Sequence, residues 1–348
     1  MSLPDTATPG KPVSRLGLYI PFALLGAFVI ALSVGWFWAR GQVVARMDRS
    51  VAMLKRAGYE VDWKDRKLSG YPFRLNVTLT EFTVRERSGW GLQAPRLEGQ
   101  AFLHAPTRWV IAAPEGLSFE RPVRGAVQVR GKLIRASLNH LSDRPPSVSL
   151  EGVGLTFAPA AGAQPFVLSA AERFEMHLRK GPDDEAGLWI SVKQGRVQLS
   201  GLLGRIASDQ PVSFAWDGRL SHISALTGRD WPEAVRAWTV AGGRMRVRPG
   251  GLTAGEAVVG VAAGDLGVAS DGRLTGALDL SLRQAPRALN ALGQSGAIPT
   301  EAAAAAAIVV TARQGGADVA RATLTFQAGQ TTLGPVALAP APRVYTPN

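Results

Sequence analysis

Hydrophobic and polar positions follow three patterns along this chain, and the first is an unbroken apolar run. From Leu16 to Ala39 no side chain is charged. Because an α-helix rises about 1.5 Å per residue, these ~24 residues reach across a hydrocarbon core of roughly 30 Å. The run predicts a transmembrane helix at residues 16–39, preceded by a polar, proline-containing, disordered tail at residues 1–15.

The end of this run favours a retained anchor over a cleaved signal peptide or a buried core helix. A signal peptide has an apolar region of about 7–15 residues, followed by small residues at the cleavage site. Here the run is longer and ends in bulky rings, among them Trp36 and Trp38, followed by Arg40. A Trp ring suits the membrane–water interface, where its N–H stays hydrated. We therefore expect Trp36, Trp38 and Arg40 to mark the membrane boundary.

The charges that flank the run bear on its orientation. Two cations precede it, Lys11 and Arg15, and five lie soon after it: Arg40, Arg46, Arg49, Lys55 and Arg56. By the positive-inside rule this bias would hold the second flank in the cytoplasm. A long following domain can nevertheless be translocated despite such charges. Charge alone therefore leaves both orientations open.

After the run, the apolar positions take a helical period. They recur up to Gly58 in the order Val44, Met47, Val51 and Leu54. This spacing predicts an amphipathic juxtamembrane helix at residues 40–58. Such a helix can lie on the lipid surface or cap the sheet that follows, and the pattern does not choose between the two.

The third pattern has a period of two and predicts β-strands. At residues 73–80 apolar side chains alternate with polar ones, which is typical of a strand with one apolar and one polar face. Similar strands are predicted at 127–134, 148–157, 166–168, 174–178, 188–192 and 197–199. Turns rich in Gly, Pro and Asp separate them, which favours antiparallel meanders over βαβ units. Residues 59–220 thus form a first β-rich half.

A second β-rich half is predicted at residues 221–340. It contains short helices at 231–238, 286–292 and 301–307, and strands that resume at Thr239 and recur at 274–282, 322–326 and 332–338. The prolines of residues 341–348 predict a loose C-terminal tail. The expected fold class is mainly β with a few short α-helices: a single N-terminal transmembrane helix followed by long antiparallel sheets, α+β overall.

Composition narrows the chemistry. The chain has no Cys, which excludes disulfides, thiolate zinc sites and cysteine nucleophiles. Its net charge is +12, and the densest cationic cluster is Arg244, Arg246 and Arg248. Because alternate residues of a strand share a face, these three arginines form either a solvated sheet face or a patch for anionic headgroups. No nucleic-acid-binding motif accompanies them, so nucleic acid is not expected as a partner.

No catalytic motif is found in the sequence. The four histidines, His104, His140, His177 and His222, are too far apart for a metalloprotease helix. Residues 293–296 (GQSG) lack the spacing and the preceding strand of a nucleophile elbow, and no phosphate-binding loop or dinucleotide fingerprint occurs. We expect no catalytic residue, cofactor or metal site, and therefore no enzyme.

One local string is more specific than these patterns. Gly70-Tyr71-Pro72-Phe73-Arg74 combines a glycine that permits a sharp bend with a proline that fixes φ. This string is interpreted as a structural corner entering a strand rather than as a ligand site.

The order of motifs around this corner carries a family resemblance. The corner follows residues 58–61 (GYEV) and precedes residues 90–97 (WGLQAPRL), and two further strings occur at 264–276 and 333–338. Together with the anchor, this order resembles the envelope proteins grouped as domain of unknown function 2125, from the anchor to nearly the end of the chain. One departure is Ala328-Gly329-Gln330, where an Asn-Gly or Asp-Gly turn would be typical.

The resemblance implies a location and no chemistry. It places the protein in the inner membrane of a Gram-negative cell as a single-pass protein, with a cytoplasmic N-terminus and a periplasmic body. This orientation goes against the charge bias. The family supplies no catalytic residues to carry over.

We therefore expect a non-enzymatic envelope scaffold or partner-binding module. The alternative is binding or transfer of a lipid or another hydrophobic ligand along an apolar sheet face, and a second alternative is an envelope enzyme with unrecognised residues. The expected partners are the lipid bilayer and, beyond it, a lipid or another envelope protein. An apolar groove open to solvent would favour the lipid role, whereas a closed, sandwich-like core would favour the scaffold.

Overall fold

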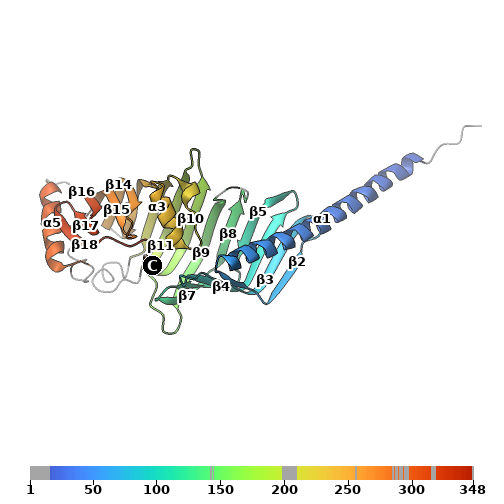
Figure 1. Ribbon diagram of the computed structural model, residues 1–348, viewed down its shortest axis with the longest axis horizontal. Helices are drawn as coiled ribbons and strands as arrows, with labels where there is room; N and C mark the ends of the chain where they lie inside the picture. Colours follow the sequence, from blue (N-terminus) through green and yellow to red (C-terminus); the bar gives the residue numbers. More distant parts are fainter. Residues whose placement is uncertain are drawn as a thin grey trace, which may run out of the picture.

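The computed structural model describes residues 16–346, except for 142, 144, 198–209, 255–256, 284–285, 287–288, 290–292, 294–297 and 315–318. The helices described are α1 (Leu16–Arg56), the 3-10 turn η1 (Ile223–Ala225), α3 (Trp231–Val240) and α5 (Thr300–Gln314). Figure 1 shows α1 projecting beyond the strands at one end of the molecule, with α5 at the other end.

The strands occupy most of the remaining chain. The first nine are β1 (Glu60–Asp62), β2 (Asp65–Ser69), β3 (Arg74–Arg85), β4 (Gly91–Phe102), β5 (Ala105–Ala112), β6 (Leu117–Arg121), β7 (Gly125–Arg130), β8 (Leu133–Asn139) and β9 (Ser147–Pro159). The others are β10 (Leu168–Lys180), β11 (Ala186–Val197), β12 (Val212–Leu220), β13 (Met245–Ala254), β14 (Ala257–Val268), β15 (Leu274–Arg283), β16 (Val319–Gln327), β17 (Gln330–Leu333) and β18 (Val336–Pro340).

These strands form one antiparallel sheet, which confirms the predicted mainly β fold. β3 pairs with β1, β2 and β4. The sheet then divides, because β4 pairs with β5 and β6 along different parts of its length, and β9 pairs with β8 and β7 in the same way. From β9 onward each strand pairs with the next, including β12 with β13, so the two predicted β-rich halves share one continuous sheet.

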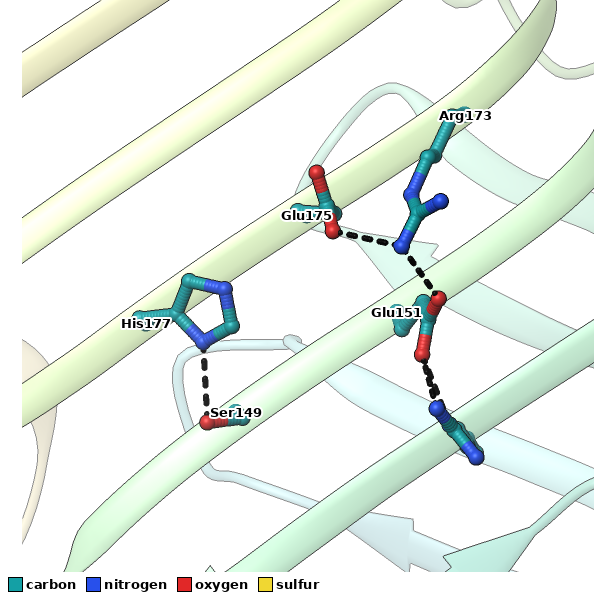
Figure 2. A network of polar contacts seen from close by, with 6 residues as sticks. Ser149, Glu151, Arg173, Glu175 and His177 are labelled. Carbon is teal, nitrogen blue, oxygen red and sulfur yellow. Dashed lines mark hydrogen bonds and ion pairs between the residues drawn. The ribbon is translucent and has the colours of Figure 1, made fainter.

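Alternation along the strands gives this sheet an apolar face and a polar face. Figure 2 shows the polar face at β8–β10, where Glu151 accepts hydrogen bonds from Arg135 (2.7 Å) and Arg173 (2.8 Å). Arg173 also lies 2.9 Å from Glu175. One residue pair further along, the Nδ1 atom of His177 lies 2.9 Å from the hydroxyl of Ser149. These polar side chains line the face of the sheet opposite the apolar face.

The predicted anchor and the predicted juxtamembrane helix form a single helix, α1. Its first part is apolar and exposed from Tyr19 to Val34, apart from partly buried positions near Ser33. Its second part contacts β1, and Asp48 lies 2.6 Å from Arg66 of β2. This part therefore contacts the sheet, which is one of the two positions that the sequence left open, and a position on the lipid surface stays a prediction.

The structure corrects two predicted boundaries after β12. The strand expected at Thr239 begins instead at Met245, because the Thr239 hydroxyl donates to the Val235 carbonyl and α3 continues to Val240. Residues 341–346 are not a loose tail, since Tyr345 is buried and its hydroxyl donates to the Ser270 carbonyl (3.1 Å).

The other short segments are placed as follows. The helix predicted at 301–307 extends over the whole of α5. Most of the helix predicted at 286–292, the end of the strand predicted at 197–199, and the tail at residues 1–15 lie outside the described residues.

Candidate functional site

Two rows of apolar side chains cross six neighbouring strands on the apolar face. Directly paired residues lie on the same face of a sheet, so the register defines the rows. The first row is Trp109, Leu138, Val148, Leu178, Leu188 and Gly218. The second is Ile111, Ala136, Leu150, Met176, Ile190 and Trp216. We call them the apolar rows.

The apolar rows are only partly buried. Leu138, Val148, Leu150, Met176, Leu178, Leu188 and Ile190 each keep intermediate solvent exposure. By contrast, the neighbouring apolar cluster at β7, β9, β10 and β11 buries Val127, Leu155 and Ala171 almost completely. A contiguous apolar surface that stays exposed to water commonly marks a binding groove.

One end of the rows starts at α1. The ring of Trp109 packs against the buried cluster of Trp36, Ala39 and Leu75. Trp36 lies near the end of the apolar run of α1, where the helix meets the sheet. The rows therefore begin next to the segment that is suited to a bilayer.

At the far end of the sheet, helices cover the apolar face. Ala306 and Val310 of α5 are fully buried against a cluster that includes Ala320 and Leu338. Val235 and Trp238 of α3 pack with Leu220 at the end of β12. The apolar face is thus closed beyond β12, whereas the apolar rows between β8 and β11 stay partly exposed.

The sheet curves toward its apolar face. The backbone N–H of Trp231, at the start of α3, donates to the carboxylate of Glu86 in the β3–β4 turn (3.0 Å). A flat sheet would hold β3 and β12 about 34 Å apart at roughly 4.8 Å per strand spacing. Because α3 lies on the apolar side, the contact shows that the apolar face is the inner side of the curve.

A cavity of about 400 Å³ lies where the sheet divides. Its walls include Phe82, Ala94, Leu117 and Val129, with Arg130 at a polar part of the lining. This volume falls within the range of small-molecule pockets, roughly 300–1,000 Å³. Within the residues that the structure describes, no group of three His, Asp or Glu side chains has metal-binding geometry.

The structure places the three predicted boundary residues around one turn of α1. Trp38 is 68% exposed, and Arg40 is exposed as well. Trp36 differs from the prediction of a hydrated N–H, because its indole donates to the Arg74 carbonyl (2.8 Å) and its ring is buried. The start of β3, rather than water, satisfies this donor.

The predicted corner is the turn between β2 and β3. Gly70 has φ of 101°, and its carbonyl accepts from the Arg74 N–H (2.8 Å). The Tyr71–Pro72 peptide bond is cis. Tyr71 and Phe73 point outward, with 52% and 62% of their surfaces exposed.

The three predicted patch arginines share the polar face, as their spacing indicates. Two of them have acidic neighbours on adjacent strands: Arg248 lies 2.8 Å from Asp217, and Arg244 lies 3.6 Å from Asp265. A role in binding headgroups stays a prediction for this group.

Sequence reasoning missed one buried charge, Arg121. Only 7% of this residue is exposed. Its guanidinium donates to four carbonyls, those of Arg124 and Gly125 (both 3.1 Å), Pro165 (3.4 Å) and Gln164. Nothing in the surrounding residues distinguishes it from the solvated arginines of other strands.

The comparisons with known proteins give one match. A family model described as "Uncharacterized protein conserved in bacteria (DUF2125)" matches residues 36–342. No curated protein and no solved structure gives a significant match to the chain. The match begins at the Trp36 contact with the sheet and ends after the last strand, so it covers the whole sheet. The chain therefore belongs to the DUF2125 family of uncharacterized conserved bacterial proteins.

Proposed function

We propose that this protein is a membrane-anchored lipid-binding protein, which holds an acyl chain against the apolar rows. The observation that carries the proposal is the partial exposure of the rows on the inner side of a curved sheet. A closed core would bury these side chains. The scaffold and enzyme roles weighed from the sequence stay predictions, and the open rows favour the lipid role over both.

The dimensions of the rows fit an acyl chain. Six adjacent strands span about 24 Å, at roughly 4.8 Å per spacing. One leaflet of a bilayer accounts for about half of a hydrocarbon core of roughly 30 Å. The rows are therefore long enough to hold one chain laid across the strands.

The energetics favour exchange with a bilayer. Moving a chain from water onto an apolar surface gains about 0.8 kcal/mol for each CH₂ group. Lipid tails are about as apolar as Leu side chains, so moving the chain from the bilayer onto the rows changes this contribution little. Loading from the membrane and release into it would therefore involve only a small net change in this free energy.

The long apolar helix supports a membrane as the place of this exchange. α1 is long and apolar enough to span a membrane, with only 6% of its most apolar window buried in the protein. We propose that it does so in the inner membrane, with the N-terminus cytoplasmic and the sheet periplasmic. A C-terminal reporter that is active only outside the cytoplasm tests this orientation. Activity of a cytoplasm-dependent reporter instead would overturn it.

The lipid role is tested by photocrosslinking in a bilayer. The full chain is placed in vesicles that contain a phospholipid with a diazirine on its acyl chain, irradiated and digested. We expect crosslinks in peptides from β8–β11 as well as in α1, where surrounding lipid will also react. Crosslinks confined to α1 would contradict the proposal.

A matched pair of variants makes the test specific to the apolar face. Met176→Arg places a charge in the middle of the second row, whereas His177→Arg places it one residue away on the polar face. We expect Met176→Arg to reduce crosslinking at β8–β11 several-fold and His177→Arg to leave it unchanged. Equal yields from two variants that both keep the parent melting temperature would count against the apolar rows as the site.

A further inference from the structure

Three exposed aromatic residues lie together beside the end of the apolar run. Tyr71 and Phe73 belong to the β2–β3 corner, and Phe102 lies at the end of β4, with 48% of its surface exposed. The corner adjoins the β4–β5 turn, because the Leu103 N–H of that turn donates to the Phe73 carbonyl (2.9 Å). We call Tyr71, Phe73 and Phe102 the aromatic rim.

The rim is in direct contact with α1. The Tyr71 hydroxyl lies 2.8 Å from the hydroxyl of Ser33. Its ring meets that of Trp36 edge-on, with centroids 5.6 Å apart, and lies 6.4 Å from that of Phe37. The corner is therefore fixed at a known height along the helix.

That height lies inside the apolar run. Ser33 comes six residues before Ala39, where the run ends, which corresponds to about 9 Å at ~1.5 Å per residue. Interfacial segments bury their apolar side about 5–10 Å into the headgroup–acyl boundary. A bilayer that surrounds residues 16–39 would therefore also reach the tip of the corner.

The side chains around the rim suit the same boundary. Arg74 places its guanidinium 5.2 Å from the centre of the Phe102 ring, and His104 stacks on the same ring. Aromatic rings concentrate at the level of the headgroups, and cations near them meet anionic lipid phosphates. Outward-facing rings with a cation beside them are favourable at this depth.

We infer that the aromatic rim inserts into the bilayer that holds α1, at the headgroup–acyl boundary on the side of the sheet. This gives the body a second membrane contact and fixes its tilt, so that the first strands of the apolar face rest on the lipid surface. The inference rests on the proposed membrane anchoring by α1 and is independent of acyl-chain binding by the apolar rows.

Single-cysteine labelling of the full chain tests this inference. Because the chain contains no Cys, one substitution gives one labelled site. Phe73→Cys and Phe102→Cys probe the rim, Phe28→Cys probes the anchor, and Val123→Cys and Val240→Cys serve as controls on other exposed parts of the body. Each variant carries an environment-sensitive fluorophore, in nanodiscs of phosphatidylcholine and phosphatidylglycerol that contain lipids spin-labelled either near the glycerol or at the end of the acyl chain.

We expect the acyl-chain spin label to quench the label at residue 28, and the glycerol-level spin label to quench those at 73 and 102, each several-fold more than the labels at 123 and 240. Quenching at 28 alone would overturn the rim insertion while leaving the anchor intact. Labels at 73 and 102 that are shielded from both the lipid quencher and aqueous iodide would mean that a protein surface covers the rim, which also overturns the inference. Absence of quenching at residue 28 would remove the anchoring on which it rests.

Discussion

The phenol of Tyr59 donates a hydrogen bond of 3.2 Å to the carboxylate of Glu86. Tyr59 follows the end of α1, and Glu86 lies in the β3–β4 turn. The carboxylate of Glu86 also accepts a hydrogen bond from the backbone N–H of Trp231. One carboxylate thus joins three parts of the chain: the segment after α1, the β3–β4 hairpin and α3. These contacts hold the curved sheet around its apolar face.

This pair predicts a dependence of stability on alkaline pH. Burial, followed by the charge of Glu86, raises the pKa of Tyr59 above its usual value. A raised pKa favours the neutral phenol in the folded state, so its contribution to stability is complete below the unfolded pKa, near 10, and is lost as pH rises through the folded pKa. Tyr59→Phe should therefore have a lower free energy of unfolding than the parent protein at neutral pH. The loss should be less than about 1 kcal/mol, because the pair is partly exposed.

The measurement is a series of melting curves from pH 7 to above pH 10 for both proteins. The gap between the two melting temperatures should stay constant to about pH 9 and close at higher pH, because only the parent loses the phenol proton. A gap that is independent of pH over this range would show that the Tyr59 hydroxyl does not stabilise the fold through Glu86.

A second prediction concerns the buried Arg121. Its guanidinium satisfies four carbonyls, two of which belong to the segment before β10. Removing a charged donor from buried partners costs about 1.5–3 kcal/mol. We expect Arg121→Leu to lose about that much unfolding free energy in urea, and Arg124→Leu, whose side chain is exposed, to change it by less than about 0.5 kcal/mol. Equal losses for the two variants would refute the anchoring role of Arg121.

A third prediction concerns the glycine of the corner. A Cβ at Gly70 would lie 2.7 Å from the Arg74 carbonyl oxygen, at a backbone φ of 101°. The left-handed region alone costs a residue with a side chain about 1–2 kcal/mol, and the clash adds to this. Gly70→Ala should therefore destabilise the protein by about 2 kcal/mol, measured by thermal or urea unfolding.

Gly187 provides the control for this substitution. It lies on β11 in ordinary strand geometry, and a Cβ there would meet no atom within 4 Å. Gly187→Ala should change stability by no more than about 0.5 kcal/mol. A small effect at both glycines would mean that the corner does not need its glycine.

A fourth prediction concerns the turn at Ala328 and Gly329, which join β16 to β17. Both residues have positive φ, 50° and 75°. Consecutive positive φ values suit Asn-Gly or Asp-Gly, because Asn tolerates this region and Ala does not. Ala328→Asn should raise the unfolding free energy by up to about 1 kcal/mol. An unchanged or lowered melting temperature would contradict this account of the turn.

Local sequence patterns were sufficient to predict most of β3, α3 and the first part of α1. The alternation at residues 73–80 predicted most of β3, and Pro232 within the first turn helped to predict α3. The uncharged run predicted the first part of α1. The helical period at residues 40–58 predicted the second part of α1, but its contacts with β1 and β2 are not visible in any local period.

The site depends on register, which local pattern does not determine. Leu150 and Leu155 are an odd number of residues apart on β9, so strict alternation would put them on opposite faces. Gly154 has φ of 60°, and a Cβ at Gly152 would clash with the Leu155 side chain, so Leu155 and Gly152 share a face. The pairing of Gly152 with Ile134 and Phe174 places that face on the apolar side. Only the structure could therefore assemble the apolar rows.

These two leucines give a direct test of which apolar residues serve stability and which serve binding. Leu155 is 5% exposed and packs in a buried cluster, whereas Leu150 is partly exposed in the second row. Truncating a buried Leu to Ala costs about 2–5 kcal/mol, because it leaves a cavity. A Leu side chain that stays partly in water loses less, on the order of 1 kcal/mol, since less apolar area is removed from the core.

We therefore expect opposite rankings in two measurements. Leu155→Ala should lower the unfolding free energy more than Leu150→Ala does, in detergent without added phospholipid. Leu150→Ala should reduce acyl-chain crosslinking at β8–β11 more than Leu155→Ala does, at a temperature where both variants are folded. If Leu150→Ala proves as destabilising as Leu155→Ala and leaves crosslinking unchanged, then Leu150 belongs to the folding core and the second row is not a lipid site.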